Sequence, residues 1–486
     1  MRRSLLTAGF SLTALALAGC MTVGPDYTRP ATADATLLNA DPAHFRGDAI
    51  ERAWWQQFHD PVLSQLVDVS LARNHDLRIA SANLKAARAV FDDVELDRLP
   101  TVTAEASHQH GKAQQPGLGE ARQELESYRA GFDMSWEIDL FGHVERSIEA
   151  AEADAQAAEA ALRAAKVSVI AEVARSYGEL RGAQTRLSVA MRNRDNQAQT
   201  LSVISARREA GRVTDLEVAT ARARLAGTEA RIPPLSAAVK RAEYRLAVLA
   251  GYRPGELPVD LAVRPLPDSE TRIAIGQASE LLRRRPDVAQ AERQLAGATA
   301  RVGVATADLF PRLSVTGFLG FVAGTGSALG ESGSKAWSVA PTLSWPAFDL
   351  GSVRARLRAS EAGADAALAG YEQTVLRALE ETENAFVAYG EDQRRLGALS
   401  EQVQANAQAV ELARVRYEEG VVDFLVLLDS ERDQLNAEEA LAEAQTSSYT
   451  GIVAIYKALG GGWEAEADTG TTTAGNSVAS AEPFTL

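Results

Sequence analysis

One ten-residue stretch of this chain occurs twice. Residues 135–144 read SWEIDLFGHV, and residues 344–353, which lie 209 positions later, read SWPAFDLGSV. Each copy ends a segment of alternating apolar and polar residues and begins a long segment rich in alanine and glutamate. Each copy therefore marks a change from strand to helix, and a period of this length indicates one architectural unit used twice.

The repeat extends on both sides of this stretch. Before the alternating segments the copies align at an offset of 211, which pairs Pro100 with Pro311, and after them at 209, which pairs Gly211 with Gly420. The slip of two residues falls inside the predicted hairpins, where loops tolerate a change in length. Length alone would suggest about three domains, but the repeat favours two copies of one unit.

The alternating segments predict two strands in each copy. Alternation over about ten residues, with tryptophan at the ends of the apolar face, is typical of membrane barrel strands. A soluble hairpin packed on a helix is the alternative. Pro341 predicts a sheet edge or a bulge. The apolar faces are formed by Val102, Ala104, Ala106, Phe132, Met134, Trp136 and Ile138 in the first copy, and by Leu313, Val315, Gly317, Leu319, Phe321, Trp337, Val339, Pro341, Leu343 and Trp345 in the second.

A long helical segment follows each pair of strands. Residues 147–209 contain no proline, and Val173, Tyr177, Leu180 and Leu187 recur at the steps of a coiled-coil seam. At 1.5 Å per residue, about 63 residues form a helix on the order of 95 Å long, far beyond the needs of a globular core. We therefore expect a rod with strands at one end and a turn at the other.

The long helices are predicted to reverse at two glycines. Gly211 and Gly420 interrupt the helical pattern, and residues 215–250 and 424–459 then run back. The first returning segment contains Pro233 and Pro234, which predict a kink or a break, whereas the second contains no proline. The two copies are therefore not expected to be mechanically identical.

The strand count requires assembly of several chains. Four strands cannot close a transmembrane barrel, whose smallest natural form has about eight, and an open sheet edge cannot be left in lipid. At least two chains must contribute strands to one barrel. The expected fold is mainly α with a membrane β-barrel portion: a long α-helical coiled-coil barrel plus four β-strands per chain, in two internal repeats.

The N-terminus has the form of an export signal with a lipidation site. Arg2 and Arg3 precede an apolar run that ends in Leu17-Ala18-Gly19-Cys20, which resembles a bacterial lipobox. Cys20 is the only cysteine of the chain and lies where diacylglycerol would be attached; a core cysteine is the alternative. Met21 after it favours the outer membrane, by resemblance to sorted lipoproteins. The expected location is the cell outer membrane, lipid-anchored, with a long periplasmic portion.

Composition and spacing together give the expected domains. Asp60 followed by Pro61 predicts the start of a helix with Asp60 as its cap. The expected segments are a signal peptide (1–19), a lipid anchor with an extended lead (20–60), a first repeat (61–251, strands about 101–138, turn near 211), a linker (252–275), a second repeat (276–462, strands about 312–345, turn near 420) and a disordered tail (463–486).

Charge and motif content argue against nucleic acid binding and against catalysis. The chain has 50 Lys and Arg against 65 Asp and Glu, a formal net charge of -15, which disfavours nucleic acid as a partner. His108 and His110 are the only histidines close together, and two ligands are too few for a metal site. The sequence contains neither a Gly-rich phosphate loop nor a Gly-x-Ser-x-Gly turn. We expect no catalytic residues, no metal and no cofactor.

Five motifs carry a resemblance to the outer membrane factor family, over nearly the whole chain. The nearest branch is that of the NodT or OprM-like efflux lipoproteins, relatives of TolC. The motifs are Gly24-Pro25-Asp26-Tyr27-Thr28-Arg29-Pro30 after the lipobox, Trp54-Trp55-Gln56-Gln57-Phe58, Arg285-Pro286-Asp287-Val288, Leu309-Phe310-Pro311-Arg312-Leu313, and the two glycine turns.

The resemblance implies a function and partners. The chain is expected to be the outer membrane channel of a tripartite efflux system, a passive duct for drugs or other small toxic compounds. Its implied partners are two further copies in a homotrimer with a twelve-stranded barrel, a periplasmic adaptor (membrane fusion) protein, an inner membrane pump of the RND type, and outer membrane lipid. A duct for type I protein secretion and a non-conducting coiled-coil envelope spacer are the alternatives.

Candidate site residues lie at the predicted turns. Leu425, Asp429 and Arg432 are spaced by four and three, so they share one helix face. In the resembling channels such positions supply a hydrophobic constriction, a carboxylate ring and a basic partner of a periplasmic gate; an ordinary solvated ion pair is the alternative. The candidates for adaptor contact are the turn residues Gly211, Val213, Asp215, Gly420, Val422 and Asp423.

Overall fold

A computed structural model describes residues 22–31, 37–114, 122–267 and 272–464. The expected signal peptide and Cys20 lie outside these residues. The chain divides into two compact units, each of which draws on both copies of the repeat. Unit 1 comprises residues 1–34, 78–162 and 286–379, and unit 2 comprises residues 35–77, 163–285 and 380–486.

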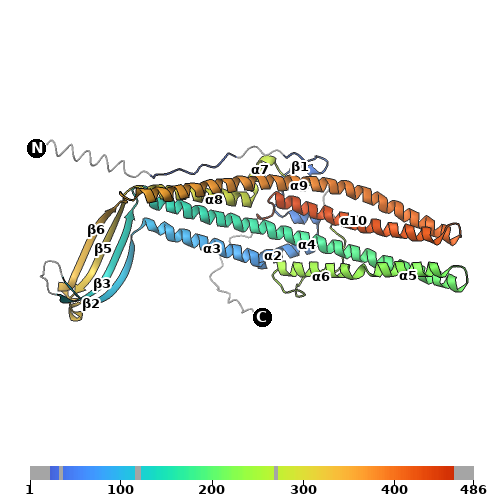
Figure 1. Cartoon of the computed structure of the whole chain (residues 1–486), viewed down its shortest axis with the longest axis horizontal. Coiled ribbons are helices and arrows are strands. Elements are labelled where there is room, and N and C mark those ends of the chain that lie inside the picture. The colour runs from blue at the N-terminus through green and yellow to red at the C-terminus, as the bar shows by residue number, and fades with distance from the viewer. Residues whose placement is uncertain (1–21, 32–36, 115–121, 268–271, 465–486) are drawn as a thin grey trace. The chain divides into compact units, whose positions relative to one another are not determined.

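In the described part of unit 1, four antiparallel strands form one sheet in the order β2-β3-β5-β6 (Figure 1). Pro341 lies in β6, at an edge of this sheet, as expected from its missing N–H donor. The strands span Thr101–Ala113 (β2), Gln123–Ile138 (β3), Arg312–Ala323 (β5) and Lys335–Ser344 (β6), with the 3-10 turns Gly326–Ala328 (η3) and Ser332–Ser334 (η4) between the last two. Both predicted hairpins are confirmed.

The strand register gathers the predicted apolar residues on one face. Ala104, Phe132, Leu319 and Trp337 form one row, paired strand by strand. Phe132, Leu319 and Trp337 are 57%, 66% and 77% exposed, so this face remains open within the described chain. The neighbouring row on the opposite face consists of Thr103, Asp133, Phe318 and Ser338 and is mainly polar.

The repeated stretch ends both hairpins in the same way. Trp136 donates its indole N–H to the carbonyl oxygen of Arg98 at 3.1 Å, and Trp345 donates to that of Leu309 at 3.0 Å. Arg98 and Leu309 are equivalent positions at the offset of 211. Each tryptophan therefore ties the end of a returning strand to the end of the helical segment that precedes the hairpin.

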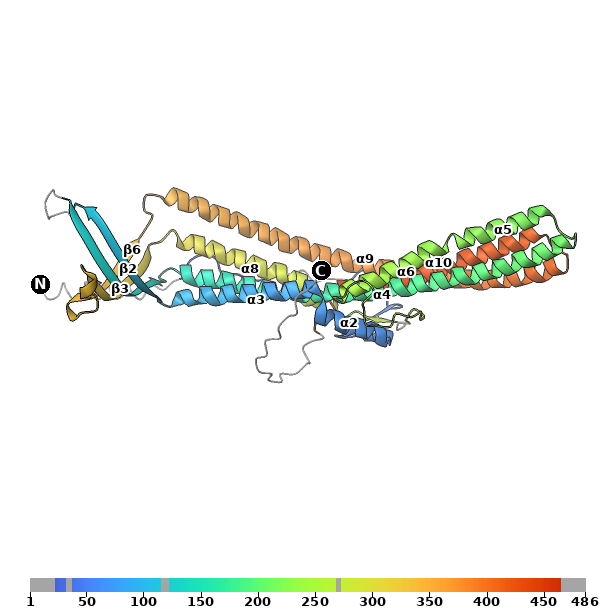
Figure 2. The same ribbon diagram turned by 90° about the horizontal axis from the view of Figure 1, so that it is seen from below.

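The predicted long helices are α4 (His143–Glu209) and α9 (Leu350–Glu418). They contain 67 and 69 residues, so each is about 100 Å long. Unit 1 contains only the first part of each, together with most of α3 (His75–Glu95), the 3-10 turn η2 (Leu96–Arg98) and α8 (Pro286–Ala307). Figure 2 shows α3 and α8 beside the first part of α4. The lengths of α4 and α9 confirm the prediction that these helices are longer than a globular core requires.

The N-terminal motif packs against the helices of unit 1. Gly24 has φ +89°, and a Cβ there would lie 2.6 Å from Cα of Gly303 in α8, so a side chain does not fit. Arg146 of α4 is 3% exposed; it donates to the carbonyl oxygen of Val23 at 3.2 Å and pairs with Asp26 at 2.5 Å. These contacts explain why glycine and aspartate stand where they do in the motif.

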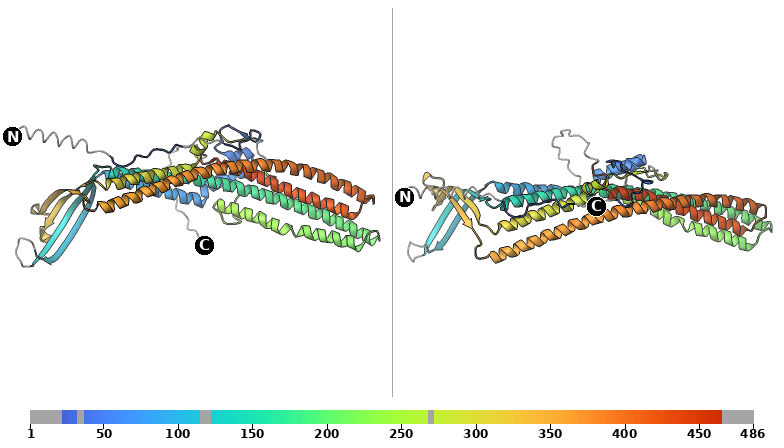
Figure 3. Two further views of the ribbon diagram at one scale, coloured as in Figure 1. Left: turned by 45° about the horizontal axis from the view of Figure 1, so that its top comes forward. Right: turned by 90° about the horizontal axis from the view of Figure 1, so that it is seen from above.

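Unit 2 contains the returning helices α5 (Asp215–Glu229), α6 (Ile232–Leu249) and α10 (Phe424–Ala458). Pro233 and Pro234 lie in the first turn of α6, so they separate α5 from α6, whereas α10 is continuous. The predicted difference between the two copies is confirmed. Both views of Figure 3 show α5 and α10 beside the last turns of α4 and α9.

Short elements of unit 2 pack against the long helices, with Phe45 on Phe386 of α9 and Asp60 on Tyr177 of α4. They are β1 (Phe45–Arg46), which pairs in parallel with β4 (Ile273–Ala274), η1 (Trp54–Phe58), α2 (Pro61–Arg73) and α7 (Ala278–Arg284). Asp60 caps α2 as predicted, by accepting from the N–H of Val62 at 2.8 Å, and it also accepts from the hydroxyl of Tyr177 in α4.

The linker between the repeats lies on the same face of α4. The side chain of Arg181 is fully buried and donates to the carbonyl oxygen of Ala262 at 2.5 Å. Gln184 donates to the carbonyl oxygen of Leu261 at 2.8 Å.

Among the helices that the structure describes, we find none that is both long enough and apolar enough for a membrane crossing.

Candidate functional site

The two turns of unit 2 have the same backbone geometry. Gly211 and Gly420 adopt φ values of +69° and +76°, the left-handed region that favours glycine. At the first turn Gly211 and Arg212 donate their backbone N–H groups to Arg208 and Arg207, each at 2.9 Å; Gly420 and Val421 donate to Tyr417 and Arg416 at 3.0 and 2.8 Å. This Schellman pattern satisfies the last carbonyl groups of α4 and α9.

An apolar cluster holds the two turns together. Phe424 is 1% exposed at the start of α10, and its ring centroid lies 5.4 Å from that of Tyr417 in α9. Val213 of the first turn packs against the same cluster. We call this set the tip cluster; its buried members are Ile204, Ala221, Ala413, Phe424, Leu427 and Leu428. It joins residues from α4, α5, α9 and α10, so the two turns form one surface.

The six predicted contact residues divide into exposed and packed positions. Val213 and Val422 are half-buried, whereas Gly211, Asp215, Gly420 and Asp423 are exposed. Asp215 is held by Arg208 at 2.6 Å across the first turn, and this guanidinium keeps the pKa of the Asp215 carboxyl below its ordinary value. The four exposed residues face solvent at the ends of the helices, as a docking surface requires.

Sequence reasoning missed exposed apolar residues of this surface, among them Leu216 and Val421. Leu216 is 73% exposed and Leu425 is 54% exposed, although both are large and apolar. They are equivalent positions at the offset of 209, so the repeat itself could have identified Leu216. Leu425 lies outside the tip cluster, which leaves its side chain available for contact with another chain.

Two of the three predicted gate residues are in contact. Arg432 lies 3.2 Å from Asp429 and 2.9 Å from Asp433. Asp429 also pairs with Arg224 of α5 at 3.3 Å, an ion pair that connects the two helical hairpins. Arg224 was not predicted, because the sequence does not specify which residues of the two hairpins face each other. Asp429 is thus the centre of a bridge rather than one half of a pair.

A buried carboxyl group lies beside this bridge. Glu431 is 7% exposed, and its nearest cationic group is Arg414 at 3.7 Å, beyond hydrogen-bond distance. Burial raises the pKa of Glu431 above its ordinary value, and the charge of Arg414 opposes this only in part. The folded chain therefore binds the proton of Glu431 more tightly than the unfolded chain does.

We expect Glu431→Gln to stabilise the chain at alkaline pH. Because the folded pKa is raised, the contribution of Glu431 to stability falls as pH rises from 4.5 through the folded value. A buried charged group without a hydrogen-bond partner costs about 1–3 kcal/mol, so the variant should melt at a higher temperature than wild type at pH 8, with a smaller difference at pH 5. Circular dichroism of purified protein measures this. Glu411→Gln, at an exposed position of α9, is the matched control; an equal effect there would contradict the assignment.

The described residues contain no cluster of three or more side chains suited to hold a metal ion. His108 stacks on Tyr128, with ring centroids 4.4 Å apart, and lies 3.2 Å from Glu126. Both contacts are made to side chains of the neighbouring strand β3, so they hold the His108 side chain against the sheet.

Comparison with known proteins identifies the family. Residues 66–252 and 278–461 match the outer membrane efflux protein family. The chain is 33% identical to the outer membrane protein OprJ of Pseudomonas aeruginosa over 96% of this chain and 97% of OprJ. It is 32% identical to the antibiotic efflux pump outer membrane protein ArpC of Pseudomonas putida, over 95% and 96% of the two chains.

A solved structure agrees with this. The structure of the outer-membrane channel OprN is 54% identical in sequence and superimposes with a TM-score of 0.89, over 91% of this chain and all of that one. The long helices and four antiparallel strands are thus the fold of a known channel. The prediction of family, fold class and a non-enzymatic role is confirmed. The chain belongs to the outer membrane efflux protein family and is an outer membrane efflux channel.

Proposed function

We propose that three copies of this chain close a twelve-stranded barrel and form the passive outer membrane duct of a tripartite efflux system. The observation that carries the proposal is the sheet of unit 1, which has an exposed apolar face and two open edges. Among the described strands, β2 and β6 each pair on one side only. Open edges are not stable in lipid, so the sheet requires partners from other chains.

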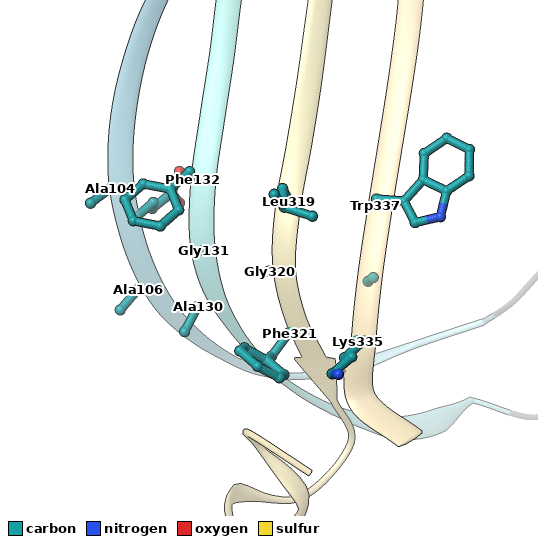
Figure 4. A pocket seen from close by; sticks show the side chains of 12 residues that line it. Ala104, Ala106, Ala130, Gly131, Phe132, Leu319, Gly320, Phe321, Lys335 and Trp337 are labelled. Carbon is teal, nitrogen blue, oxygen red and sulfur yellow. The ribbon is translucent and has the colours of Figure 1, made fainter. Parts of the chain in front are cut away.

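The apolar face has the properties of a lipid-facing surface. Ala104, Phe132, Leu319 and Trp337 line a hollow of about 780 Å³ on this face (Figure 4). Val339 and Leu343 of β6 are 62% and 66% exposed. Monomeric soluble proteins rarely expose a continuous apolar surface of this kind. Lipid chains are the occupant that would cover it without further protein.

The width of the duct favours three chains over two. Two chains would supply eight strands, and the interior of an eight-stranded barrel is just wide enough to be filled by side chains. A drug-sized solute needs a wider interior, which twelve strands provide. The family resemblance also implies three chains.

The anchor is proposed from the N-terminal sequence and the partners from the two turns. Cys20, in its lipobox-like context, would carry lipid, and several lipid chains in one assembly hold more firmly than one. The exposed turn residues would meet a periplasmic adaptor, which connects the duct to an inner membrane pump of the RND type. The relative ArpC belongs to an antibiotic efflux pump, so antibiotics and similar small toxic compounds are the proposed cargo.

The bridge of Asp429, Arg224 and Arg432 is proposed as the periplasmic gate, with Leu425 as its apolar constriction. Surface ion pairs are individually weak. A closure that depends on three symmetry-related copies of such a bridge can therefore be opened by adaptor binding.

Reconstitution of the purified full chain in a planar bilayer tests the proposed duct. We expect discrete conductance steps, because the duct is continuous across the membrane once the gate opens. A non-conducting coiled-coil spacer would produce a folded trimer without steps at any voltage, and that result would refute the proposal. Loss of antibiotic resistance in the native strain on deletion of the chain, with unimpaired protein secretion, separates efflux from type I secretion.

A further inference from the structure

A polar groove lies among α4, α6 and α10 of unit 2, with a volume of about 620 Å³. Its charged lining consists of Arg175, Arg186, Arg241, Arg245, Glu179 and Glu443, with four positive groups against two negative groups. The chain as a whole has a net charge of -15. A positive surplus in one groove is therefore opposite to the charge of the protein. We call these residues the arginine groove.

Two of the four arginines form no ion pair with a residue that the structure describes. Arg175 and Arg245 both pair with Glu172, at 2.7 and 3.0 Å. Arg186 and Arg241 make neither an ion pair nor a hydrogen bond with any residue that the structure describes, and the Nε atom of Arg186 is buried without a partner. A buried guanidinium N–H that lacks an acceptor is costly. An incoming acceptor would remove that cost.

Two arginines nearer the turns have carboxylate partners. Arg231 pairs with Glu439 of α10 at 3.0 Å, and Arg192 of α4 lies 3.5 Å from Glu438. The same helices therefore pair Arg192 and Arg231 with carboxylates but leave Arg186 and Arg241 without an ion pair in the groove.

The groove lies on the uncovered face of α4. The opposite face carries Tyr177, Arg181 and Gln184, which bind Asp60 and the linker. Glu179 and Arg186 each lie two positions from one of these residues, which is about 200° around the helix. A face that the chain wraps with its own segments cannot line a duct, so the face with the arginine groove is the one available to solutes.

The position of the groove on α10 agrees with this. Glu443 and Ser447, which line the groove, are 14 and 18 residues after Asp429. At 3.6 residues per turn these separations are about four and five whole turns. The groove and the proposed gate residue Asp429 therefore lie on the same side of α10.

The lining suits an oxyanion. A guanidinium group presents parallel N–H donors that match a carboxylate or a phosphate, and the hydroxyl groups of Thr446, Ser447 and Thr450 lie in the same groove. Gly182 forms part of the lining, and a Cβ there would collide with Thr446, so glycine keeps this space open. The volume falls in the range of small-molecule sites, about 300–1,000 Å³.

We propose that the arginine groove is a transit site for carboxylate- or phosphate-bearing solutes. It binds them weakly, since a conducting site must release what it binds. Glu443 is the internal competitor, because its exposed carboxylate lies in the same lining. The location in the transport path rests on the proposed duct, whereas binding itself does not require conduction.

Arginine footprinting of the wild-type full chain in detergent tests the site. Phenylglyoxal modification is followed by peptide mass spectrometry at constant ionic strength, with citrate as the carboxylate probe and pyrophosphate as the phosphate probe. We expect at least one probe to slow modification of Arg186 and Arg241 by fivefold or more. Arg394, a 72% exposed side chain on α9 outside the groove, is the internal control and should change less than twofold.

The other outcomes overturn the proposal. Equal protection of Arg394 would indicate general screening of charge. The proposal is also wrong if neither probe protects Arg186 and Arg241, or if these two arginines do not react in the absence of a probe. Glu443→Gln provides a second measurement, since it should lower the half-protecting concentration; an unchanged or higher value counts against the site. The result does not depend on conductance steps, so it is independent of the bilayer test of the duct.

Discussion

Asp429→Ala is expected to raise the mean conductance of the reconstituted channel by roughly an order of magnitude. Asp429 is the acceptor for both Arg224 of α5 and Arg432 of α10, so its loss removes the only described ion pair of this bridge that joins the two helical hairpins. Each pair is weak, but in the proposed trimer three copies lose the bridge together. Single-channel recording in planar bilayers measures the change.

Two variants sharpen this test. Asp433→Ala is the matched control, because Asp433 contacts Arg432 within α10 but does not contact Arg224. Its conductance should stay near wild type. Arg224→Ala should reproduce the effect of Asp429→Ala, because it breaks the same bridge from the other side. If Asp433→Ala opens the channel as much as Asp429→Ala, the effect is one of net charge and the gate assignment is wrong.

Replacement of both turn glycines by valine, Gly211→Val with Gly420→Val, is expected to reduce antibiotic resistance in the native strain to that of a deletion. Both glycines have positive φ values, and a left-handed conformation costs an L-residue about 1–2 kcal/mol. Both turns would therefore change shape. A Cβ at either position has open space within the described chain, so the proposed trimer should still form in normal yield. Minimal inhibitory concentrations and native gels measure the two effects.

Two control pairs separate the turn surface from general strain. Gly255→Val with Gly330→Val introduces the same strain elsewhere, since these glycines have φ values of +91° and +93°, and it should leave resistance unchanged. Gly211→Asn with Gly420→Asn should retain most of the resistance, because asparagine tolerates the left-handed conformation. Normal resistance with the valine pair at the turns would show that adaptor contact does not depend on their shape.

The repeat made most of the fold predictable. Two offsets, 211 and 209, located both hairpins, both long helices and both glycine turns, because period-two and helical patterns each persist long enough to be distinguished. The pairing of the two hairpins into one sheet could be inferred only from the need to close a barrel. The division into two compact units could not be predicted, since each unit combines parts of both repeats that are distant in sequence.

Parts of the candidate site were hidden from the sequence for a physical reason. Arg224 is equivalent to Asp433 at the offset of 209, yet it pairs with Asp429, one helical turn away. The stagger between two packed helices determines such a partner, and local patterns do not encode that stagger. Glu431, by contrast, follows the buried Leu427 and Leu428 by four and three positions, so its burial could have been predicted from helical spacing.

Disulfide trapping between the edge strands tests most directly whether three chains close one barrel. Ser338→Cys in β6 is combined in turn with a cysteine at Thr103, Glu105, Ser107 or Gln109 of β2; the only native cysteine is Cys20. Facing residues of neighbouring antiparallel strands lie close enough for a disulfide. We predict that at least one pair gives a non-reducing ladder that ends at three chains and collapses to one chain on reduction. A ladder that ends at two chains or continues beyond three, or a panel without any interchain disulfide, would contradict a closed trimer.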